Sequence, residues 1–288
     1  MLRAVKRMHA LMETPDIEKQ RAAQENFGGI LSKSRELEYQ NFNIGDIPAE
    51  WSCVGRSHMK KYVILYCHGG GYTSGSFRYA RSITNKLASS TSMDVLSFDY
   101  RLAPENPFPA ALEDAVAVWD YLMYQGYGAR DVIVAGDSAG GNLALTLTLR
   151  LKEHGRLLPR GLILFSPWTD LTMNGKSHKE RADLDPILTE EYLKRCIGSY
   201  APEMDLRDPY LSPLYGDFTG FPPTYIQVGT NEILLSDSRK LRKQLQEHHV
   251  PVKMEAYPGM WHVFQMSPLK TAYHAMDQVA EFIFDVCR

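Results

Sequence analysis

The pattern that most restricts the fold is an alternation of apolar, strand-like runs with amphipathic helical stretches. The expected strands lie at residues 62–67, 93–100, 131–135, 161–165, 224–228 and 252–257. Helical patterns follow or separate them, at 77–91, 108–125, 139–154, 236–248 and 268–286. Continuous apolar runs are typical of strands buried on both faces, and strands that alternate with helices form parallel sheets. The sequence therefore predicts an α/β fold, with a mostly parallel central sheet and helices on both faces.

Two segments depart from this alternation. Residues 1–30 show an amphipathic helical pattern with an apolar stripe, followed by strand-like segments at 37–44 and 50–54; the stripe comprises Leu2, Val5, Met8, Leu11 and Met12. Residues 172–215 are polar and rich in charge and proline, with one helical stretch near 188–200. A long insertion in such a fold usually covers the site. We expect an N-terminal helical cap segment at 1–45, a core at 46–171 and 216–288, and a cap insertion at 172–215.

The composition excludes several classes of protein. The chain has 288 residues, 44% of them hydrophobic and 23% charged, with a net charge of −2. Such a chain buries a large core, and without a basic stripe it predicts no nucleic-acid partner. No apolar run is long enough to span a membrane, and the N-terminus lacks the apolar region of a secretory signal. The four cysteines form no CxxC pair, which favours free thiols and a cytoplasmic location.

The sequence GDSAG, residues 136–140, places one serine where a predicted strand becomes a helix. A nucleophilic hydroxyl must be held clear of its own backbone, and a sharp strand-to-helix turn does this if its neighbours are very small. Gly136 and Gly140 meet that need on either side of Ser138. The helix that follows also points free N–H groups and its positive dipole end towards the site. The alternative is a glycine-rich turn in which the serine only caps a helix.

A serine nucleophile needs an oxyanion-binding site, and the sequence HGGG at 68–71 is the candidate. Backbone without side chains can bring N–H groups close to a carbonyl oxygen. Together with the N–H of Ala139, the glycine loop would form an oxyanion hole. We expect His68 to shape this loop through hydrogen bonds. A flexible glycine turn is the alternative.

The general base is expected after the last strand, because the chain order in this arrangement is serine, acid, histidine. His262 lies in a loop after the strand at 252–257, whereas His274 falls within the final helical pattern. The acid should follow the strand at 224–228, where Glu232 and Asp237 are the candidates. Glu232 comes directly after the strand, and Asp237 has a ready alternative role at a helix N-terminus. We therefore expect His262 as the base and Glu232 as the acid.

These motifs together resemble the hormone-sensitive-lipase-like family of bacterial α/β-hydrolase esterases. The resemblance rests on HGGG at 68–71, DYRLAPENPFPAALEDA at 99–115, GDSAGGNLA at 136–144, SPWTDL at 166–171 and YPGMWHVF at 257–264. It implies an α/β-hydrolase fold with a helical cap, and ester hydrolysis through an acyl-enzyme without a metal or cofactor. The family's acid is usually an aspartate about thirty residues before the histidine. Glu232 occupies that place and departs from the pattern.

The resemblance also implies roles for further residues. The N–H groups of Gly70, Gly71 and Ala139 would bind the oxyanion, and His68, Gly69 and Asp137 would support that loop. Tyr100, Arg101 and Glu105 are expected to form a buried polar network below the site. The residues expected to line the substrate pocket are Tyr72, Trp168 and Trp261.

The sequence thus predicts a serine carboxylesterase for small-molecule esters with short- to medium-chain acyl groups, acetyl esters included. Amidase or transacylase activity is one alternative, because these reactions share the same triad and acyl-enzyme. A non-catalytic small-molecule receptor on the same scaffold is a second, and the presence of His262 argues against it. A monomer and a homodimer are both compatible with the sequence.

Overall fold

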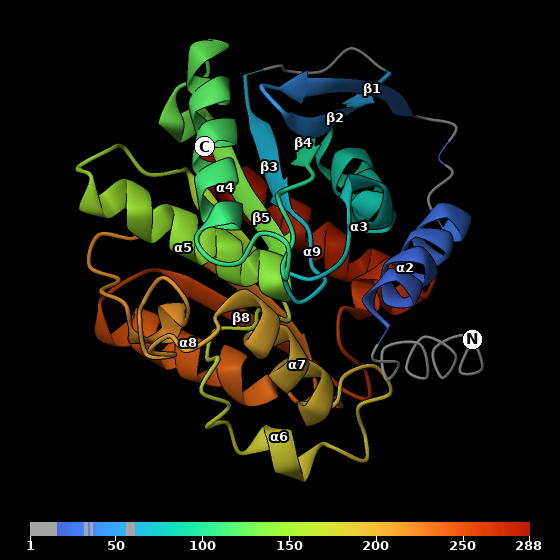
Figure 1. Ribbon diagram of the computed structural model, residues 1–288. Helices are drawn as coiled ribbons and strands as arrows, with labels where there is room; N and C mark the ends of the chain where they lie inside the picture. Colours follow the sequence, from blue (N-terminus) through green and yellow to red (C-terminus); the bar gives the residue numbers. More distant parts are fainter. Residues whose placement is uncertain (1–15, 32–33, 35–36, 56–60) are drawn as a thin grey trace.

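The computed structural model describes residues 16–31, 34, 37–55 and 61–288, and its centre is one eight-stranded sheet (Figure 1). The strands are β1 Leu37–Ile44, β2 Ile47–Val54, β3 Val63–Cys67, β4 Asp94–Phe98, β5 Val132–Asp137, β6 Gly161–Phe165, β7 Thr224–Gly229 and β8 Val252–Tyr257. Their order in the sheet is β1-β2-β4-β3-β5-β6-β7-β8. The pairs from β4 to β8 are parallel, whereas β2 is antiparallel to both β1 and β4. The predicted α/β fold is confirmed.

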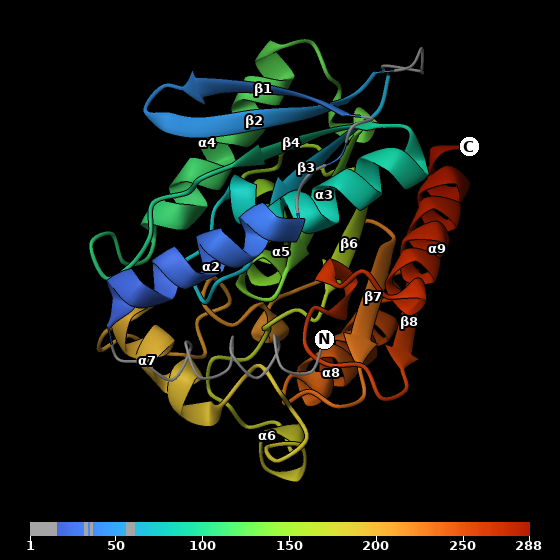
Figure 2. The same ribbon diagram turned by 90° about the vertical axis from the view of Figure 1, so that its right-hand side faces the viewer.

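Helices cover both faces of the sheet (Figures 1 and 2). They are α2 Ile17–Leu31, α3 Phe77–Thr91, α4 Ala110–Tyr124, α5 Ala139–Glu153, α6 Ser177–Glu180, α7 Glu190–Tyr200, α8 Leu235–Glu247 and α9 Lys270–Cys287. One hydrophobic cluster joins α3 and α9 to one face, and a larger cluster joins α4, α5, α7 and α8 to the other. Strands β3, β5 and β6 are buried along their whole length, as their continuous apolar sequences predict.

The N-terminal part of the sheet differs from the predicted division into cap and core. Strand β1 pairs with β2 over its full length, from Leu37 opposite Val54 to Ile44 opposite Ile47. Residues 37–44 were expected to be strand-like, yet the proposed boundary at 45 assigns them to the cap segment. Because β1 forms a hairpin with β2, it is structurally part of the sheet. The apolar stripe expected between Leu2 and Met12 lies outside the described residues.

Helices α2 and α7, one from each of the two predicted cap segments, both contact the loop that follows β3. Helix α7 and the short helix α6 come from the insertion between β6 and β7, and α2 packs along α3 (Figure 2). Thr189 is the N-cap of helix α7, and its hydroxyl accepts the Tyr192 N–H; the helix buries Tyr192, Leu193, Cys196 and Tyr200. A side-chain cap and an apolar face are typical of a helix that packs onto a core.

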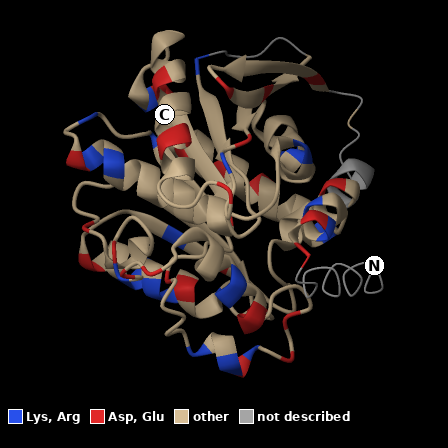
Figure 3. Ribbon diagram, in the orientation of Figure 1, with Lys and Arg blue, Asp and Glu red and all other residues tan. Residues whose placement is uncertain are grey.

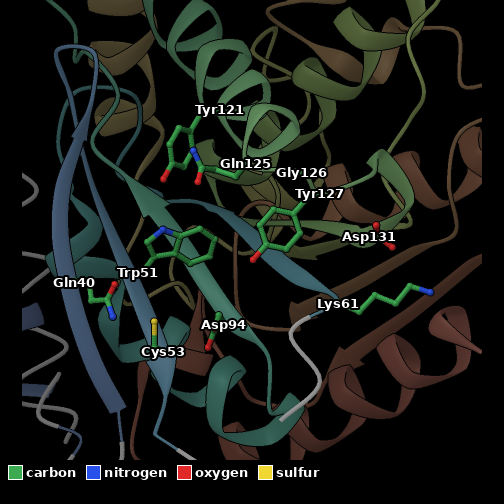
Figure 4. A pocket seen from close by; sticks show the side chains of 10 residues that line it. All are labelled: Gln40, Trp51, Cys53, Lys61, Asp94, Tyr121, Gln125, Gly126, Tyr127 and Asp131. Carbon is green, nitrogen blue, oxygen red and sulfur yellow. The ribbon is translucent and has the colours of Figure 1, made fainter. Parts of the chain in front are cut away.

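A hollow of about 580 Å³ lies at the opposite end of the parallel strands (Figure 4). Its lining residues are Gln40, Trp51, Cys53, Lys61, Asp94, Tyr121, Gln125, Gly126, Tyr127 and Asp131. Asp94 begins β4 and Asp131 precedes β5, so the hollow faces the amino ends of these strands. None of the predicted site residues lines it.

Charges of both signs are mixed over the structure (Figure 3), as in the ion pair between Lys152 and Asp217. Within the described ranges, no helix is long and apolar enough to cross a membrane. In the same part of the chain, no group of three or more His, Cys, Asp or Glu side chains could hold a metal ion. All four cysteines lie in the described residues and are free thiols.

Candidate active site

Ser138 lies at the junction of β5 and α5, in a backbone conformation that L-residues rarely adopt. Its φ and ψ are 53° and −118°, and its carbonyl accepts the first helical hydrogen bond, from the Asn142 N–H. The Ser138 N–H donates to Phe165 at the end of β6, 2.9 Å away. Unfavourable backbone geometry persists only where surrounding structure enforces it, and such geometry clusters at active sites. The GDSAG segment therefore forms the sharp turn that its glycines predict.

Two of these glycines lie where no side chain fits. A Cβ on Gly140 would be 2.1 Å from the Cys67 carbonyl oxygen and 2.4 Å from that of His68. A Cβ on Gly136 would be 2.3 Å from the Gly140 carbonyl oxygen. The backbone in the first turn of α5 therefore lies directly against the backbone at the end of β3, and no side chain larger than a hydrogen atom fits between them. This approach brings the N-terminus of α5 beside the HGGG loop.

Asp137 supports the HGGG loop from the neighbouring strand. One carboxylate oxygen accepts both the Gly69 N–H, at 2.9 Å, and the Tyr66 hydroxyl, at 2.7 Å. Gly69 has to lack a side chain, because a Cβ there would be 2.2 Å from the other carboxylate oxygen. Asp137 is buried, and this burial raises its pKa to about 6. The loop after β3 is thus tied to the residue that precedes Ser138.

His68 is a structural part of the same loop. Burial lowers the pKa of His68 to about 4, so the imidazole is neutral at neutral pH. Its Nδ1 lies 2.8 Å from the Gly69 carbonyl oxygen, which can only accept, so Nδ1 carries the proton. The ring stacks on Tyr100 with a centroid separation of 4.1 Å, and the Tyr100 hydroxyl donates to the His68 carbonyl.

Helix α7 packs directly on the glycine loop. Gly70 and Gly71 have φ angles of 122° and 63°, and the Gly70 carbonyl accepts the N–H groups of Thr73 and Ser74. A Cβ on Gly71 would be 2.5 Å from the Cys196 sulfur and 3.0 Å from the Tyr192 hydroxyl, both on α7. Cap helix α7 therefore limits the space beside the predicted oxyanion hole. The N–H of Ala139 lies in the first turn of α5, where a helix supplies no partner.

Helix α2 also holds this loop, through Arg21. The guanidinium donates to the carbonyl oxygens of Thr73, at 2.9 Å, and Ala103, at 3.1 Å. It also forms two hydrogen bonds with the carboxylate of Glu105, at 2.9 and 2.7 Å.

The expectation of a buried network that contains Arg101 and Glu105 is wrong, because both side chains are exposed. Arg101 instead pairs with two carboxylates of α4, those of Glu113 and Asp114, at 3.0 and 2.8 Å. Of the three residues expected in this network, only Tyr100 is buried. Its hydroxyl bonds to the HGGG loop, as described above.

We expect Arg21→Ala to destabilise the protein by about 1–3 kcal/mol, because buried carbonyl groups lose a charged donor. The measurement is thermal unfolding, alongside Glu105→Gln as the matched control. Glu105 is half exposed, so the loss of its ion pair alone should cost less than about 1 kcal/mol. Equal melting temperatures for the two variants would show that the bonds to Thr73 and Ala103 contribute nothing.

His262 and Glu232 meet at the carboxyl ends of β7 and β8. The His262 Nδ1 lies 3.7 Å from Glu232 Oε2, longer than a hydrogen bond, and both side chains are buried. Burial lowers the pKa of His262, while the carboxylates of Asp185 and Asp137 act in the opposite direction. Burial raises the pKa of Glu232 to about 8. The predicted base and acid are therefore neighbours.

Asp237, the other candidate acid, has a different set of partners. One of its oxygens accepts the N–H groups of Thr169, at 3.0 Å, and Asp170, at 3.1 Å. The other lies 3.4 Å from Nε2 of His178, a buried residue of the cap insertion. Asp237 thus joins the cap insertion to the loop after β6.

Sequence reasoning missed two buried polar residues beside Glu232. Asp185 of the cap insertion accepts the Ile233 N–H at 2.9 Å. Ser166 donates to Glu232 Oε2 at 2.8 Å and accepts the Val263 N–H at 3.2 Å. Asp185 lies in the predicted cap insertion, and Ser166 begins the SPWTDL motif. Neither pattern indicates a position beside Glu232, so only the folded structure reveals it.

The three aromatic residues expected at a substrate pocket differ in exposure. Tyr72 is buried, donates its hydroxyl to Asn142 at 2.7 Å, and stacks on Tyr200 of α7 at 3.8 Å. Trp168 is completely buried, and its backbone N–H donates to the Ser138 carbonyl at 3.0 Å. Trp261, beside His262, is partly exposed.

Comparison with known proteins agrees with this geometry. A family model described as the α/β-hydrolase fold matches residues 64–266. An esterase of Acinetobacter venetianus is 42% identical over 76% of this chain and 74% of its own length. An acetyl-hydrolase of Streptomyces hygroscopicus is 38% identical over 84% of this chain and 79% of its own.

Solved structures are similar over nearly the whole chain. An esterase from the bacterial hormone-sensitive lipase family superposes with a TM-score of 0.94, at 32% identity, over 99% of this chain and 97% of the other. A hormone-sensitive lipase from a metagenome library has a TM-score of 0.92 and 34% identity, over 99% and 97% of the two chains. The chain therefore belongs to the α/β-hydrolase family, among the esterases of the bacterial hormone-sensitive-lipase type.

Proposed function

We propose that Ser138 is the nucleophile of this esterase, His262 its general base and Glu232 the acid that orients the histidine. The observation that carries the proposal is the Ser138 turn, with φ of 53° between two glycines that have no room for a side chain. A strained serine at the start of a helix is held away from its own backbone. The approach of His262 and Glu232 to 3.7 Å supports the other two roles.

The reaction follows from these roles. His262 Nε2 accepts the Ser138 proton as the hydroxyl attacks the ester carbonyl, and the N–H groups of Gly70, Gly71 and Ala139 stabilise the oxyanion. His262 then protonates the leaving alcohol, and a water molecule attacks the acyl-enzyme by the reverse route. In this scheme His68, Gly69 and Asp137 keep the oxyanion loop in place, since all three are hydrogen-bonded within it.

The substrates we propose are small-molecule esters with short- to medium-chain acyl groups, acetyl esters included. Ser138 and His262 are each 6% exposed, and Cys196 and Tyr192 of α7 limit the space beside Gly71. A cap this close favours small acyl groups. The similarity to a Streptomyces acetyl-hydrolase supports the same choice. We propose that Tyr72, Trp168 and Trp261 border this pocket. A cytoplasmic location, a monomeric or homodimeric state and the cap segments at 1–45 and 172–215 remain sequence-based proposals.

The experiment is hydrolysis of p-nitrophenyl esters with acyl chains from C2 to C12, together with matched p-nitroanilides. We expect turnover of the esters, with the highest kcat/KM at C2 to C6, and far slower turnover of the amides. A sulfonyl fluoride should stop the reaction and add its mass to the peptide that contains Ser138. Comparable turnover of the amides would favour the amidase alternative, and a folded protein that hydrolyses neither would contradict the proposal.

We expect kcat/KM to rise with pH through a midpoint near 8. A protonated Glu232 would donate to His262 Nδ1 and leave the imidazole proton on Nε2, the wrong tautomer for accepting the Ser138 proton. Since burial raises the Glu232 pKa to about 8, the active carboxylate predominates only above that pH. The measurement is a pH profile of kcat/KM, in which Glu232→Gln should remove this limb. An unchanged limb in that variant would assign it to another group.

The free energy of unfolding, unlike kcat/KM, should fall as the pH rises through this range. The folded pKa of Glu232 lies above its ordinary value of 4.5, so the folded state binds more protons between pH 4.5 and about 8. The contribution of Glu232 to stability is complete below pH 4.5 and is lost as the pH rises through about 8.

A further inference from the structure

Ser166 occupies a junction between the two loops that carry the proposed acid and base. It follows directly after β6, is completely buried, and has a φ of 46°. Its backbone N–H donates to the Gln227 carbonyl of β7 at 2.7 Å. The preceding residue, Phe165, accepts the Ser138 N–H. Phe165 is therefore hydrogen-bonded to the serine turn. Ser166 is hydrogen-bonded through its backbone to β7 and through its side chain to the loops of the proposed acid and base.

When Glu232 is ionised, the direction of each hydrogen bond at the Ser166 hydroxyl is fixed, because a carboxylate can only accept. The Val263 N–H can only donate, so at 3.2 Å the hydroxyl oxygen is its acceptor. The single hydroxyl hydrogen is then available for Glu232 Oε2, at 2.8 Å. Both partners are buried, so neither bond is exchanged for one to bulk water. One side chain thus links the carboxyl group of Glu232 to the peptide unit that follows His262.

The Ser166 hydroxyl bonds to the same carboxylate oxygen of Glu232 that faces His262. Oε2 is both the acceptor of the Ser166 bond and the atom 3.7 Å from His262 Nδ1. The other oxygen, Oε1, has no hydrogen-bond partner among the described residues. Ser166 is therefore the side chain that hydrogen-bonds Oε2, and the Gly229 backbone also acts on this carboxylate.

We propose that Ser166 is a positioning residue, which holds the Glu232 carboxylate and the His262 loop in the geometry needed for proton transfer. This inference rests on the proposed function of Ser138, His262 and Glu232. The hydroxyl also favours the charged form of the acid, because it donates to the carboxylate and so lowers the pKa that burial raises. The other carboxylates nearby are those of Asp237, which acts on Glu232, and Asp185 and Asp137, which act on His262.

The test compares Ser166→Gly with Ser166→Cys in the full chain. Glycine accepts a φ of 46° without strain, so Ser166→Gly removes the hydroxyl while the backbone conformation stays favourable. We expect kcat for p-nitrophenyl acetate to fall about 10- to 100-fold with little change in KM, and the acidic limb of the pH profile to move up by about one unit. Ser166→Cys retains a weak donor of similar shape and should lie between the parent and Ser166→Gly.

A double-mutant cycle with Glu232→Gln separates positioning from a general structural role. If Ser166 acts through Glu232, its substitution should cost little more once the carboxylate is gone. Additive losses, or a Ser166→Gly variant with the parent's kcat and pH profile, would overturn the inference. Thermal unfolding of each variant tests whether the folded state is retained.

A second readout does not depend on activity. In protein labelled with ¹³C at glutamate carboxyl groups, the Glu232 signal is assigned by its absence in Glu232→Gln. Its titration midpoint should rise by about one pH unit in Ser166→Gly. A parent that hydrolyses no ester would contradict the proposed function, whereas an unchanged Glu232 midpoint would overturn the role of Ser166.

Discussion

Replacement of Ser138 by alanine is expected to lower kcat for p-nitrophenyl acetate by about 10⁴- to 10⁶-fold, the range seen when a serine hydrolase loses its nucleophile. In the proposed mechanism this variant lacks the atom that forms the acyl-enzyme, so the remaining rate would reflect binding and oxyanion stabilisation alone. The measurement is steady-state hydrolysis at pH 8.5, where most of Glu232 is ionised because burial raises its pKa to about 8. Sulfonyl fluoride labelling should disappear with the activity.

The fold of this variant should be unaffected. Ser138 contributes its backbone N–H and carbonyl to Phe165, Asn142 and Trp168, and these bonds remain in alanine. The φ of 53° is equally unfavourable for both residues. Thermal unfolding should therefore differ little from that of the parent. Ser82→Ala is a matched control, because it removes another buried serine hydroxyl, one on α3 that has no hydrogen-bond partner among the described residues. A Ser138→Ala variant that keeps more than about a hundredth of the parent activity would contradict the nucleophile assignment.

Most of the fold could be predicted from the sequence, because the strands are distinct apolar runs. The predicted boundaries of 161–165 and 252–257 coincide with β6 and β8, and those of 77–91 coincide with α3. The hairpin of β1 and β2 was harder to predict from the sequence. Half of the β1 side chains face solvent, so the pattern of residues 37–44 does not show whether they belong to the sheet or to a cap.

The candidate site likewise contains residues that the sequence could identify and residues that it could not. Ser138, the HGGG loop, Glu232 and His262 each lie next to a recognisable motif, so the sequence identifies them as candidates. Asp185 has no such signal, and SPWTDL, the motif that begins with Ser166, does not by itself indicate a role for this serine. Asp185 comes from the cap insertion and Ser166 from a strand end, and only the fold brings them to the loops of Glu232 and His262. Arg101 and Glu105 show the opposite error, because the family resemblance implied a buried network and both side chains are exposed.

Gly140→Ala is expected to destabilise the protein by about 4 kcal/mol or more, an effect that is exceptional for a single substitution. The added Cβ would lie 2.1 and 2.4 Å from two backbone oxygens, those of Cys67 and His68. A flexible side chain could move away, but these oxygens belong to the end of β3 and the start of the HGGG loop. Either α5 or this backbone has to shift, and both carry groups of the proposed site. Chemical denaturation should show a large fall in the free energy of unfolding, with loss of esterase activity in the folded fraction.

Gly198→Ala is the matched control, since it makes the same substitution in helix α7 where no atom lies within 4 Å of the new Cβ. Alanine has the higher helix propensity, so this variant should be as stable as the parent or more stable by up to about 1 kcal/mol. The contrast isolates the backbone contact from the general effect of adding a methyl group. If Gly140→Ala proved as stable and as active as Gly198→Ala, the close approach of α5 to β3 could not be what holds the Ser138 turn. If only Gly140→Ala unfolds, the requirement for glycine after the proposed nucleophile follows from packing of two backbones, independently of the chemistry at Ser138.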